Sequence, residues 1–454
     1  MKAPPAEAVA IGLLLVGRIA FLLASPAGLF GDAFNYFSAA QVIVSTGRLP
    51  PLAVQPHGYA LLISPLLLLG AEKIASSVLL MNVCMDTAVV LLLTFLAWRL
   101  FASPCGWMVR FFACTALVVQ PFTAEMVGAV YTEQPCIFFV FFGVCALIRL
   151  VSSKNSHALP VIGPLLLGFA ALMRIDLLVL NLPILVFFLW LQNRQLLNFV
   201  RKAAVSLALY AALPILMLAF QYHSSGEIGI IRTEQHHPGY LAWMRTWFSF
   251  EKQHDKFAFD RGDNKWEGFE PANYPERAFD AAEERKQIAL LLSRWRADGY
   301  SESIDRGFAE LANQRLRARP LYGYVLVPSM RMLHFWFNID GAQTFLRVVH
   351  LHRPLSTMVV AFTLLLKLSF NCLALVGIYF VWENLRRGRS GDKWLELGRL
   401  SLVAALLRTF ELGALGLIAG GGLMEVRYIL VAFPFLIILS LIGGQFLMRN
   451  RAHW

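Results

Sequence analysis

The chain has 454 residues, of which 57% are hydrophobic and only 15% are charged, and its mean hydropathy is +0.59. This composition is far more apolar than that of a typical globular domain and excludes an ordinary soluble protein. The net charge of +11 does not indicate a nucleic-acid partner, because the excess positive charge lies between apolar segments and forms no basic domain. Such a distribution is typical of a protein that crosses a membrane several times.

Apolar segments long enough to cross the hydrocarbon core, about 17 to 25 helical residues, occur along most of the chain. They lie near residues 9–26, 74–98, 107–124, 134–150, 157–173, 176–192, 203–221, 355–382, 396–420 and 428–447. The first has no clear small-residue cleavage pattern, so we interpret it as a span and not as a signal peptide.

Two further apolar segments do not fit simple spans. The segment from Gly58 to Gly70 is short, which suits a re-entrant or interfacial helix. The segment from Tyr322 to Asp340 is long enough to cross, but Arg331 and His334 fall in its middle and its neighbours are aromatic. This pattern favours an interfacial helix.

Basic residues occur at alternate ends of the apolar segments. They are Lys2, Arg99, Arg110, Arg149, Lys154, Arg194, Arg201, Lys202, Arg386, Arg387, Arg389, Lys393, Arg449 and Arg451. By the positive-inside rule, these connections and both termini are predicted to be cytoplasmic. The outer face then receives residues 27–57, the connections near 125–133, 174–176 and 421–427, and a polar insert. We expect an integral multi-pass protein of a bacterial inner membrane, with its chemistry on the periplasmic side.

The polar insert, residues 222–320, holds 16 of the 29 acidic and 15 of the 40 basic residues, so it is nearly neutral. It is rich in aromatic residues, and Pro275 to Arg319 shows the apolar spacing of one or two amphipathic helices. The sequence therefore predicts an all-α polytopic membrane protein in three parts. These are a transmembrane module (1–221, with the outer loop 27–57), an outer or periplasmic loop domain acting as a cap (222–320), and an interfacial helix followed by C-terminal transmembrane helices (321–454).

The first outer loop contains Asp32, the only acidic residue between Glu7 and Glu72. An Asp directly before a helix is a common N-terminal cap. A carboxylate at the water-facing mouth of a membrane cavity can also act as a general base that takes a proton from an incoming hydroxyl. Spacing alone favours the cap, and the two roles are compatible.

Three short outer connections carry further charged residues. Glu133 precedes a Phe-rich span and suits the first turn of a helix. Arg174 and Asp176 separate two apolar segments, where they can pair with each other or where the guanidinium can bind a phosphate in bidentate geometry. Glu425 and Arg427 precede the last span, where Arg427 can be an interfacial anchor or a second arginine for an anionic headgroup.

Some polar residues fall inside the apolar segments, where they usually face a cavity or a partner. Arg18 lies in the first span, and Arg408 with Glu411 lies in the ninth. Arg408 and Glu411 have i, i+3 spacing and can pair on one helix face, so a structural ion pair is favoured. In the second span, Asn82 and Asp86 are one turn apart and indicate hydrogen bonds between helices.

The sequence lacks the common signatures of nucleotide binding, dinucleotide binding and zinc proteolysis. We therefore predict no metal site. An enzyme of this composition would take its activated substrate from the membrane.

The outer motifs form an ordered series between positions 30 and 435. It has an acid followed by Tyr, Ala and Gly, then Pro-x-Gly-Tyr, Thr-Glu-x-Pro, an Arg-x-acid turn and a late Arg-Tyr. The residues are Asp32, Tyr36, Ala40, Gly47, Pro56, His57, Gly58, Tyr59, Thr132, Glu133, Pro135, Arg174, Asp176, Arg427, Tyr428 and Pro434. Together they resemble the GT-C superfamily of integral membrane glycosyltransferases, such as protein O-mannosyltransferases and lipid A aminoarabinose transferases. The turn at Met173 to Asp176 departs from the family's Thr-Arg-Pro-Glu at the Pro and in its shorter acid.

The resemblance implies a bundle of about 10 to 13 transmembrane helices. It also implies inverting transfer of a sugar from a polyprenyl-phosphate donor to a hydroxyl of a glycan, lipid or protein on the outer face. Asp32 would be the general base, and Arg174 and Arg427 would bind the donor phosphate. Supporting or substrate-contacting residues would be Tyr36, His57, Tyr59, Glu133, Asp176 and Glu425. No cofactor is required by this reading, a divalent cation is compatible with it, and the expected partners are donor, acceptor and membrane lipids but no nucleic acid.

A lipid-linked sugar flippase or transporter is the main alternative, because Arg18, Arg408 and Glu411 could line a translocation route. Transporters tend to show matched repeats in two halves, which this sequence lacks, and they do not need a long outer insert. A polymerase or ligase for surface polysaccharide would share the lipid-linked donor. An accessory membrane protein without catalytic activity is a further alternative.

Overall fold

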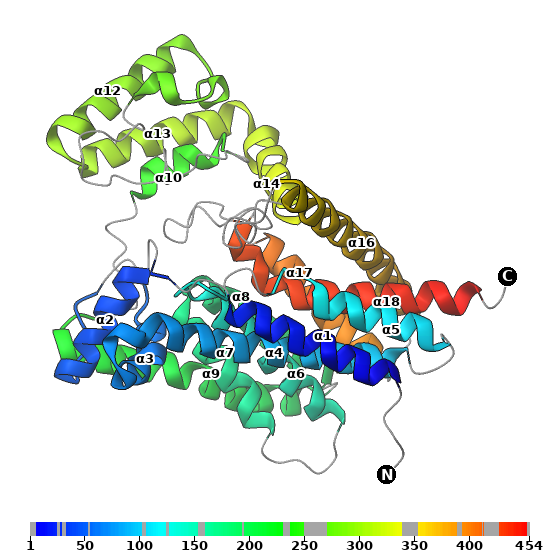
Figure 1. Ribbon diagram of the computed structural model, residues 1–454. Helices are drawn as coiled ribbons and strands as arrows, with labels where there is room; N and C mark the ends of the chain where they lie inside the picture. Colours follow the sequence, from blue (N-terminus) through cyan, green and yellow to red (C-terminus); the bar gives the residue numbers. More distant parts are fainter. Residues whose placement is uncertain are drawn as a thin grey trace. The chain divides into compact units, whose positions relative to one another are not determined.

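The computed structural model in Figure 1 describes most of the chain. The described residues are 6–24, 28–29, 33–52, 55–101, 106–123, 127–152, 159–192, 195–229, 237–248, 270–337, 353–387, 393–410, 412 and 426–451. Within these ranges the regular structure is helical, and the one extended pairing is an isolated bridge between Gly28 and Ala129.

Five helices in the described part of the chain are long and apolar enough to cross a membrane, judged by length and composition. They lie at Ala6–Leu23, Ala71–Leu100, Leu196–Ser225, Ala361–Arg386 and Ile429–Met448. Shorter apolar helices lie at Gly58–Leu69, Trp107–Val119, Glu133–Ile148, Val161–Met173 and Asp176–Leu191. The prediction of an all-α membrane protein is confirmed at this level.

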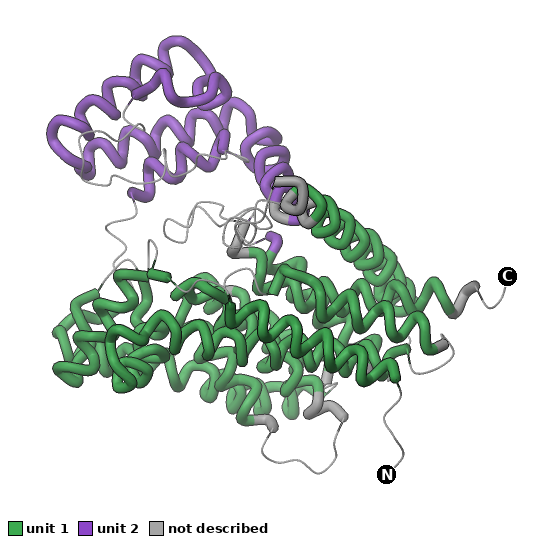
Figure 2. The backbone as a smooth tube through the Cα atoms, in the orientation of Figure 1, with its two compact units in different colours: residues 1–231, 339–408, 429–454 green, residues 232–338, 409–428 purple. Residues whose placement is uncertain are grey.

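The chain divides into two compact units, shown in Figure 2. Unit 1 comprises residues 1–231, 339–408 and 429–454, and unit 2 comprises residues 232–338 and 409–428. All five candidate spans belong to unit 1.

Unit 1 is built from the apolar helices. Its elements are α1 (Ala6–Leu23), α2 (Ala33–Thr46), α3 (Gly58–Ile63), η1 (Ser64–Leu69), η2 (Ala71–Lys73), α4 (Ile74–Leu100), α5 (Gly106–Val119), α6 (Glu133–Ser152), α7 (Leu159–Met173), α8 (Asp176–Gln192), α9 (Leu196–Ser225), α16 (Arg353–Arg386), α17 (Lys393–Phe410) and α18 (Phe433–Arg451). The turn η9 (Val426–Ala432) leads into α18; residues 409–410 of α17 and 426–428 of η9 belong to unit 2. Helix α4 packs against α1, α5, α6 and α18, and α7 packs against α6, α8 and α9.

Helices α16 and α18 approach each other closely through two glycines. A Cβ atom added to Gly377 would collide with the carbonyl of Leu439, and one added to Gly443 would collide with the carbonyl of Leu373. Small residues allow helix backbones to meet in this way inside a membrane, where packing and not water exclusion drives association. Several large apolar side chains on other helices point outward, among them Leu13, Phe112 and Leu216. That surface would be unfavourable in water and suits lipid.

Unit 2 is a smaller helical unit with an aromatic core. Its elements are α10 (Pro238–Arg245), the turns η5 (Pro271–Asn273) and η6 (Glu276–Ala278), α12 (Ala282–Asp298), α13 (Glu302–Ala318), the π-helical turn η7 (Tyr322–Leu326) and α14 (Val327–Phe337). Helix α13 packs against α10 and α12. The core contains Tyr240, Trp243, Trp247, Trp295 and Phe308, all fully buried. Their rings meet mostly edge to face or tilted, the geometry that aromatic pairs prefer.

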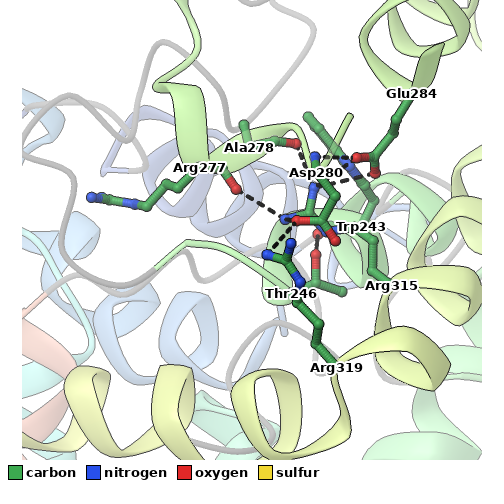
Figure 3. A network of polar contacts seen from close by, with 8 residues as sticks. All are labelled: Trp243, Thr246, Arg277, Ala278, Asp280, Glu284, Arg315 and Arg319. Carbon is green, nitrogen blue, oxygen red and sulfur yellow. Dashed lines mark hydrogen bonds and ion pairs between the residues drawn. The ribbon is translucent and has the colours of Figure 1, made fainter. Parts of the chain in front are cut away.

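Arg315 joins α13 to the turn before α12, as Figure 3 shows. Its Nη1 donates to the carbonyl of Ala278 at 2.6 Å, and its Nη2 donates to the carbonyl of Arg277 at 2.9 Å. It also forms ion pairs with Asp280 at 3.1 Å and Glu284 at 3.2 Å. A guanidinium is suited to this task because it offers five donors in a rigid plane.

Candidate functional site

Two loops that are distant in sequence run side by side in unit 1. The Gly28 amide donates to the carbonyl of Gly128 at 3.3 Å, and Gly28 and Ala129 form a parallel bridge. These loops precede α2 and α6. The loop that contains Asp32 in the sequence is therefore paired, through its described part, with the loop that leads to Glu133.

Tyr59 is fixed against the end of α7. A Cβ atom on the preceding Gly58 would collide with the carbonyl of Leu172, so glycine is what allows α3 to begin directly on that helix end. Tyr59 is fully buried, and its ring stands edge to face against Tyr36 of α2, with 5.0 Å between centroids. Two of the predicted site residues therefore touch.

Arg174, in the turn between α7 and α8, is the centre of an ion-pair network. Its Nε and Nη2 donate to the two carboxylate oxygens of Asp176 at 3.1 and 2.8 Å. Its Nη1 donates to Oε1 of Glu133, the first residue of α6, at 3.1 Å. The sequence left local pairing and a functional role open for Arg174, and the structure shows that the local pair forms.

Arg408 of α17 is the fourth member of this network. Its Nη1 lies 2.8 Å from Oδ2 of Asp176, the same oxygen that accepts from Arg174. The exposed fractions of the four side chains are 0% for Arg408, 3% for Glu133, 13% for Arg174 and 15% for Asp176. We call these four residues the outer-end network, because three of them lie in connections that the charge pattern predicts to be on the outer face.

The charges of the outer-end network sum to zero, two arginines against two carboxylates. Burying such charges is costly unless they are paired and hydrogen-bonded, and removing one partner from a buried pair costs about 3–5 kcal/mol. The arrangement also brings two guanidiniums to one oxygen of Asp176. Two guanidiniums around one anionic oxygen form the geometry in which arginines bind a phosphate.

The Tyr59 hydroxyl lies beside this network. It is close enough to Glu133 for that carboxylate's charge to act on it, and it has no hydrogen-bond partner among the described residues. A buried hydroxyl without a partner is unfavourable by about 1–3 kcal/mol. Such a group is well placed to bond a ligand or a water molecule.

His57 lies in the turn before α3, and its supporting or substrate-contacting role stays a prediction. Its Nε2 lies 3.1 Å from the carbonyl of Pro51, and its side chain is buried. Burial lowers the pKa of His57, although the backbone carbonyls of Pro51 and Pro50 act in the opposite direction. A neutral His57 therefore closes the loop that leads into α3, one residue before the contact of Gly58 with α7.

The other predicted site residues lie beyond what the structure describes. Asp32 and Glu425 fall outside the described residues, and for Arg427 only the backbone, within η9, is described. Their assignments as general base, supporting residue and phosphate ligand stay predictions. Helix α2 begins at Ala33, immediately after Asp32.

A second buried ion pair braces unit 1. Arg18 of α1 holds both carboxylate oxygens of Asp86 of α4, at 2.8 and 3.0 Å. Its Nη1 also donates to the carbonyls of Val118 and Gln120. Asn82, one turn before Asp86, donates to the carbonyls of Val127 and Ala129. The predicted hydrogen bonding between helices is confirmed for Asp86, which bonds Arg18 of α1, whereas Asn82 bonds the connection before α6.

Sequence reasoning missed the partner of Arg408. The i, i+3 spacing favours Glu411, which lies outside the described residues, whereas the structure pairs Arg408 with Asp176 on α8. An arginine inside an apolar segment is energetically unfavourable unless it is paired, so the sequence indicated that Arg408 has a partner. It did not indicate which residue the partner is.

Among the described residues, no group of three or more His, Cys, Asp or Glu side chains is placed to hold a metal ion. Comparison of the sequence with protein-family models and with curated proteins finds no match in either case. The geometry of the site and the sequence motifs are therefore the observations from which a function is inferred.

Proposed function

We propose that this protein is a membrane glycosyltransferase that moves a sugar from a polyprenyl-phosphate donor to a hydroxyl acceptor. The proposal includes a GT-C-type bundle of transmembrane helices, with unit 2 exposed on the outer side of the membrane. The observation that carries it is the outer-end network with Tyr36 and Tyr59 beside it. Five segments that are separate in sequence contribute these residues, and the ordered motifs that resemble the superfamily include most of them.

The donor phosphate would bind at Arg174 and Arg408. Both guanidiniums already hold an anionic oxygen of Asp176, and a phosphate oxygen is a ligand of the same kind. We propose that Asp176 and Glu133 keep the arginines oriented until the donor arrives, and that the phosphate then takes part of their hydrogen bonds. Arg427, which the sequence suggested as the second arginine, stays a prediction.

The transfer would be a single displacement with inversion. The acceptor oxygen forms a bond to the anomeric carbon while the bond from that carbon to the phosphate oxygen breaks. The acceptor proton goes to the carboxylate of Asp32, acting as general base. The electron pair of the broken bond stays on the polyprenyl phosphate, whose charge the arginines stabilise.

Arg18 gives no support to the flippase alternative. A residue that lines a translocation route must be able to exchange partners, but Arg18 is tied to Asp86 by two hydrogen bonds and to two main-chain carbonyls. This arrangement is that of a brace between α1, α4 and the end of α5. We therefore rank transfer above translocation.

The direct test uses the full-length protein in lipid nanodiscs with a panel of polyprenyl-phosphate sugars and candidate acceptors, glycan, lipid and peptide. We expect mass spectrometry to show one sugar moved to one class of acceptor, with release of polyprenyl phosphate. Donor binding without release of polyprenyl phosphate would contradict the proposal. Movement of a labelled donor across proteoliposome bilayers, without transfer, would instead establish the flippase alternative.

The proposed orientation has its own test. Arg306→Cys on α13 and Arg201→Cys on α9 both introduce a thiol at an exposed position, one in unit 2 and one in a connection predicted to be cytoplasmic. In intact cells we expect an impermeant maleimide to label the variant at 306 above the level of the unsubstituted protein. The variant at 201 should label only after permeabilisation. The reverse result would invert the predicted topology.

A further inference from the structure

The last described segment of unit 2 before residue 338, which comprises Leu321, η7 and α14, leaves an apolar face exposed. Its exposed side chains are Leu321 (77%), Tyr324 (64%), Leu333 (59%), Val325 (55%), Leu326 (49%) and Phe337 (48%). Helices α12 and α13 are each longer than α14, yet the only large apolar side chain that they expose is Leu290 of α12. The apolar surface of the described part of unit 2 is therefore concentrated on η7 and α14. We call these six residues the α14 face.

The charge in α14 points away from this face. Arg331 is fully buried, and its Nε donates to the carbonyl of Phe248 at 2.9 Å. Its Nη2 donates to the carbonyl of Arg245, the last residue of α10. A cation near the C-terminal end of a helix is favourable because the unpaired carbonyls there carry partial negative charge. Arg331 thus joins α14 to the rest of unit 2, so the charged side chain of the helix is turned inward while Leu333 and Phe337 stay exposed.

We propose that the α14 face is the surface by which unit 2 lies on the lipid bilayer. The helix would lie in the plane of the membrane interface, with these side chains among the headgroups and the first part of the acyl chains. A crossing is disfavoured because Arg331, in the middle of α14, is bonded to the carbonyls of Phe248 and Arg245 and so holds one side of the helix against the rest of unit 2. An interfacial position satisfies its apolar face without a crossing.

Two observations favour a bilayer over another protein as the partner. The next described helix along the chain is α16, which contains the candidate span Ala361–Arg386, so a candidate span follows α14 in the sequence. The segment is also rich in tyrosine and tryptophan, with Tyr322, Tyr324 and Trp336 within 15 residues. These residue types concentrate where membrane meets water, because their rings are apolar and carry a polar group.

The proposal can be tested in the full-length protein by placing an environment-sensitive fluorescent amino acid at one position at a time. Positions 333 and 337 report on the α14 face. Position 290 is the matched control, because Leu290 is as exposed as Leu333 but lies on α12. In nanodiscs, we expect acyl-chain-brominated lipids to quench the probe at 333 and 337 but not at 290. Aqueous iodide should quench it at 290 only.

The depth of the probe in the bilayer distinguishes an interfacial position of α14 from a deeper one. With bromine placed at successive acyl positions, we expect the strongest quenching at 333 from the shallowest bromine, about 5–10 Å below the headgroups. Strongest quenching from bromine near the bilayer centre would overturn the interfacial placement. Iodide quenching at 333 equal to that at 290 would show that the face is in water. Protection from both quenchers would show that protein, either unit 1 or a second copy, covers it. The probe positions are exposed in unit 2, so these substitutions leave its aromatic core intact.

Discussion

Arg174 in unit 1 and Arg315 in unit 2 are both largely buried arginines held by two carboxylates, but they are held differently. Each nitrogen of the Arg174 guanidinium donates to a carboxylate oxygen. Arg315 has carboxylate partners as well, and it also donates to the main-chain carbonyls of Ala278 and Arg277. Arg18 resembles Arg315 in this respect, since it holds two carbonyls in addition to Asp86.

The difference concerns how easily the named partners can be exchanged. A main-chain carbonyl leaves its partner only if the backbone moves, so Arg315 and Arg18 stabilise the fold. A carboxylate side chain can rotate, and another anion can replace it at a guanidinium with little change in geometry. Substitutions in the outer-end network that keep the charge should therefore alter binding and turnover more than folding, and loss of Arg315 should do the opposite.

The largest effect is expected for Asp32→Asn. Without a general base the transfer rate should fall about 10²- to 10⁴-fold, while donor affinity and thermal stability stay unchanged. Turnover by mass spectrometry and donor binding measured on the same preparation test this. Asp298→Asn, at the exposed end of α12, is the control and should keep full activity. Full transfer by the Asp32 variant would remove this residue from the mechanism.

Arg315→Ala should have the largest effect on stability. The substitution leaves Asp280, Glu284 and two main-chain carbonyls without their shared partner, so we expect a loss of about 3–5 kcal/mol, visible as increased proteolysis of unit 2 and a lower unfolding temperature. Arg306→Ala is the matched control on the same helix. Arg306 is paired with Glu302 but exposed, so its loss should cost no more than about 1 kcal/mol. Equal effects of the two substitutions would contradict the structural role of Arg315.

Arg174→Lys and Arg408→Lys should weaken donor binding by about tenfold each, because lysine keeps the charge but lacks the planar pair of donors. Isothermal titration with a polyprenyl-phosphate sugar measures this. Arg315→Lys is the control in unit 2 and should leave donor affinity unchanged. Unchanged affinity in both unit 1 variants would move the phosphate site elsewhere, with Arg427 the next candidate.

The smallest effect concerns pH and His57. Burial lowers the pKa of His57 in the folded chain, so below about pH 6.5 the unfolded chain binds the proton more readily. Stability is then fully present above that pH and declines as the pH falls. His57→Gln should make the unfolding temperature less dependent on pH between about 7.5 and 5. The exposed His223→Gln is the control, and an equal change there would remove His57 as the cause.

Much of the fold could be predicted because it depends on local sequence. Hydropathy located the apolar helices, because the length and the apolar composition needed to cross a membrane are properties of each segment by itself. Helix starts were predictable too: α6 begins at Glu133 and α2 directly after Asp32. One or two amphipathic helices were expected within Pro275 to Arg319, and the structure has two there, α12 and α13.

The candidate site was only partly predictable. Motif order selected Tyr36, Tyr59, Glu133, Arg174 and Asp176, and the structure brings these residues together. The contribution of Arg408 could not be foreseen, because Asp176 and Arg408 are separated by most of the chain. Two apolar helices can meet in many ways without changing their hydropathy.

By itself, the sequence determined that this is a helical membrane protein whose charges are sorted along the chain, because a bilayer imposes length and polarity on each segment separately. The tertiary structure decided which charges share a carboxylate, which hydroxyl lacks a partner, and that Arg331 faces inward while the apolar side of α14 faces out. These features depend on the direction of side chains and on contacts between distant segments, and neither is encoded in the local pattern of apolar and polar residues.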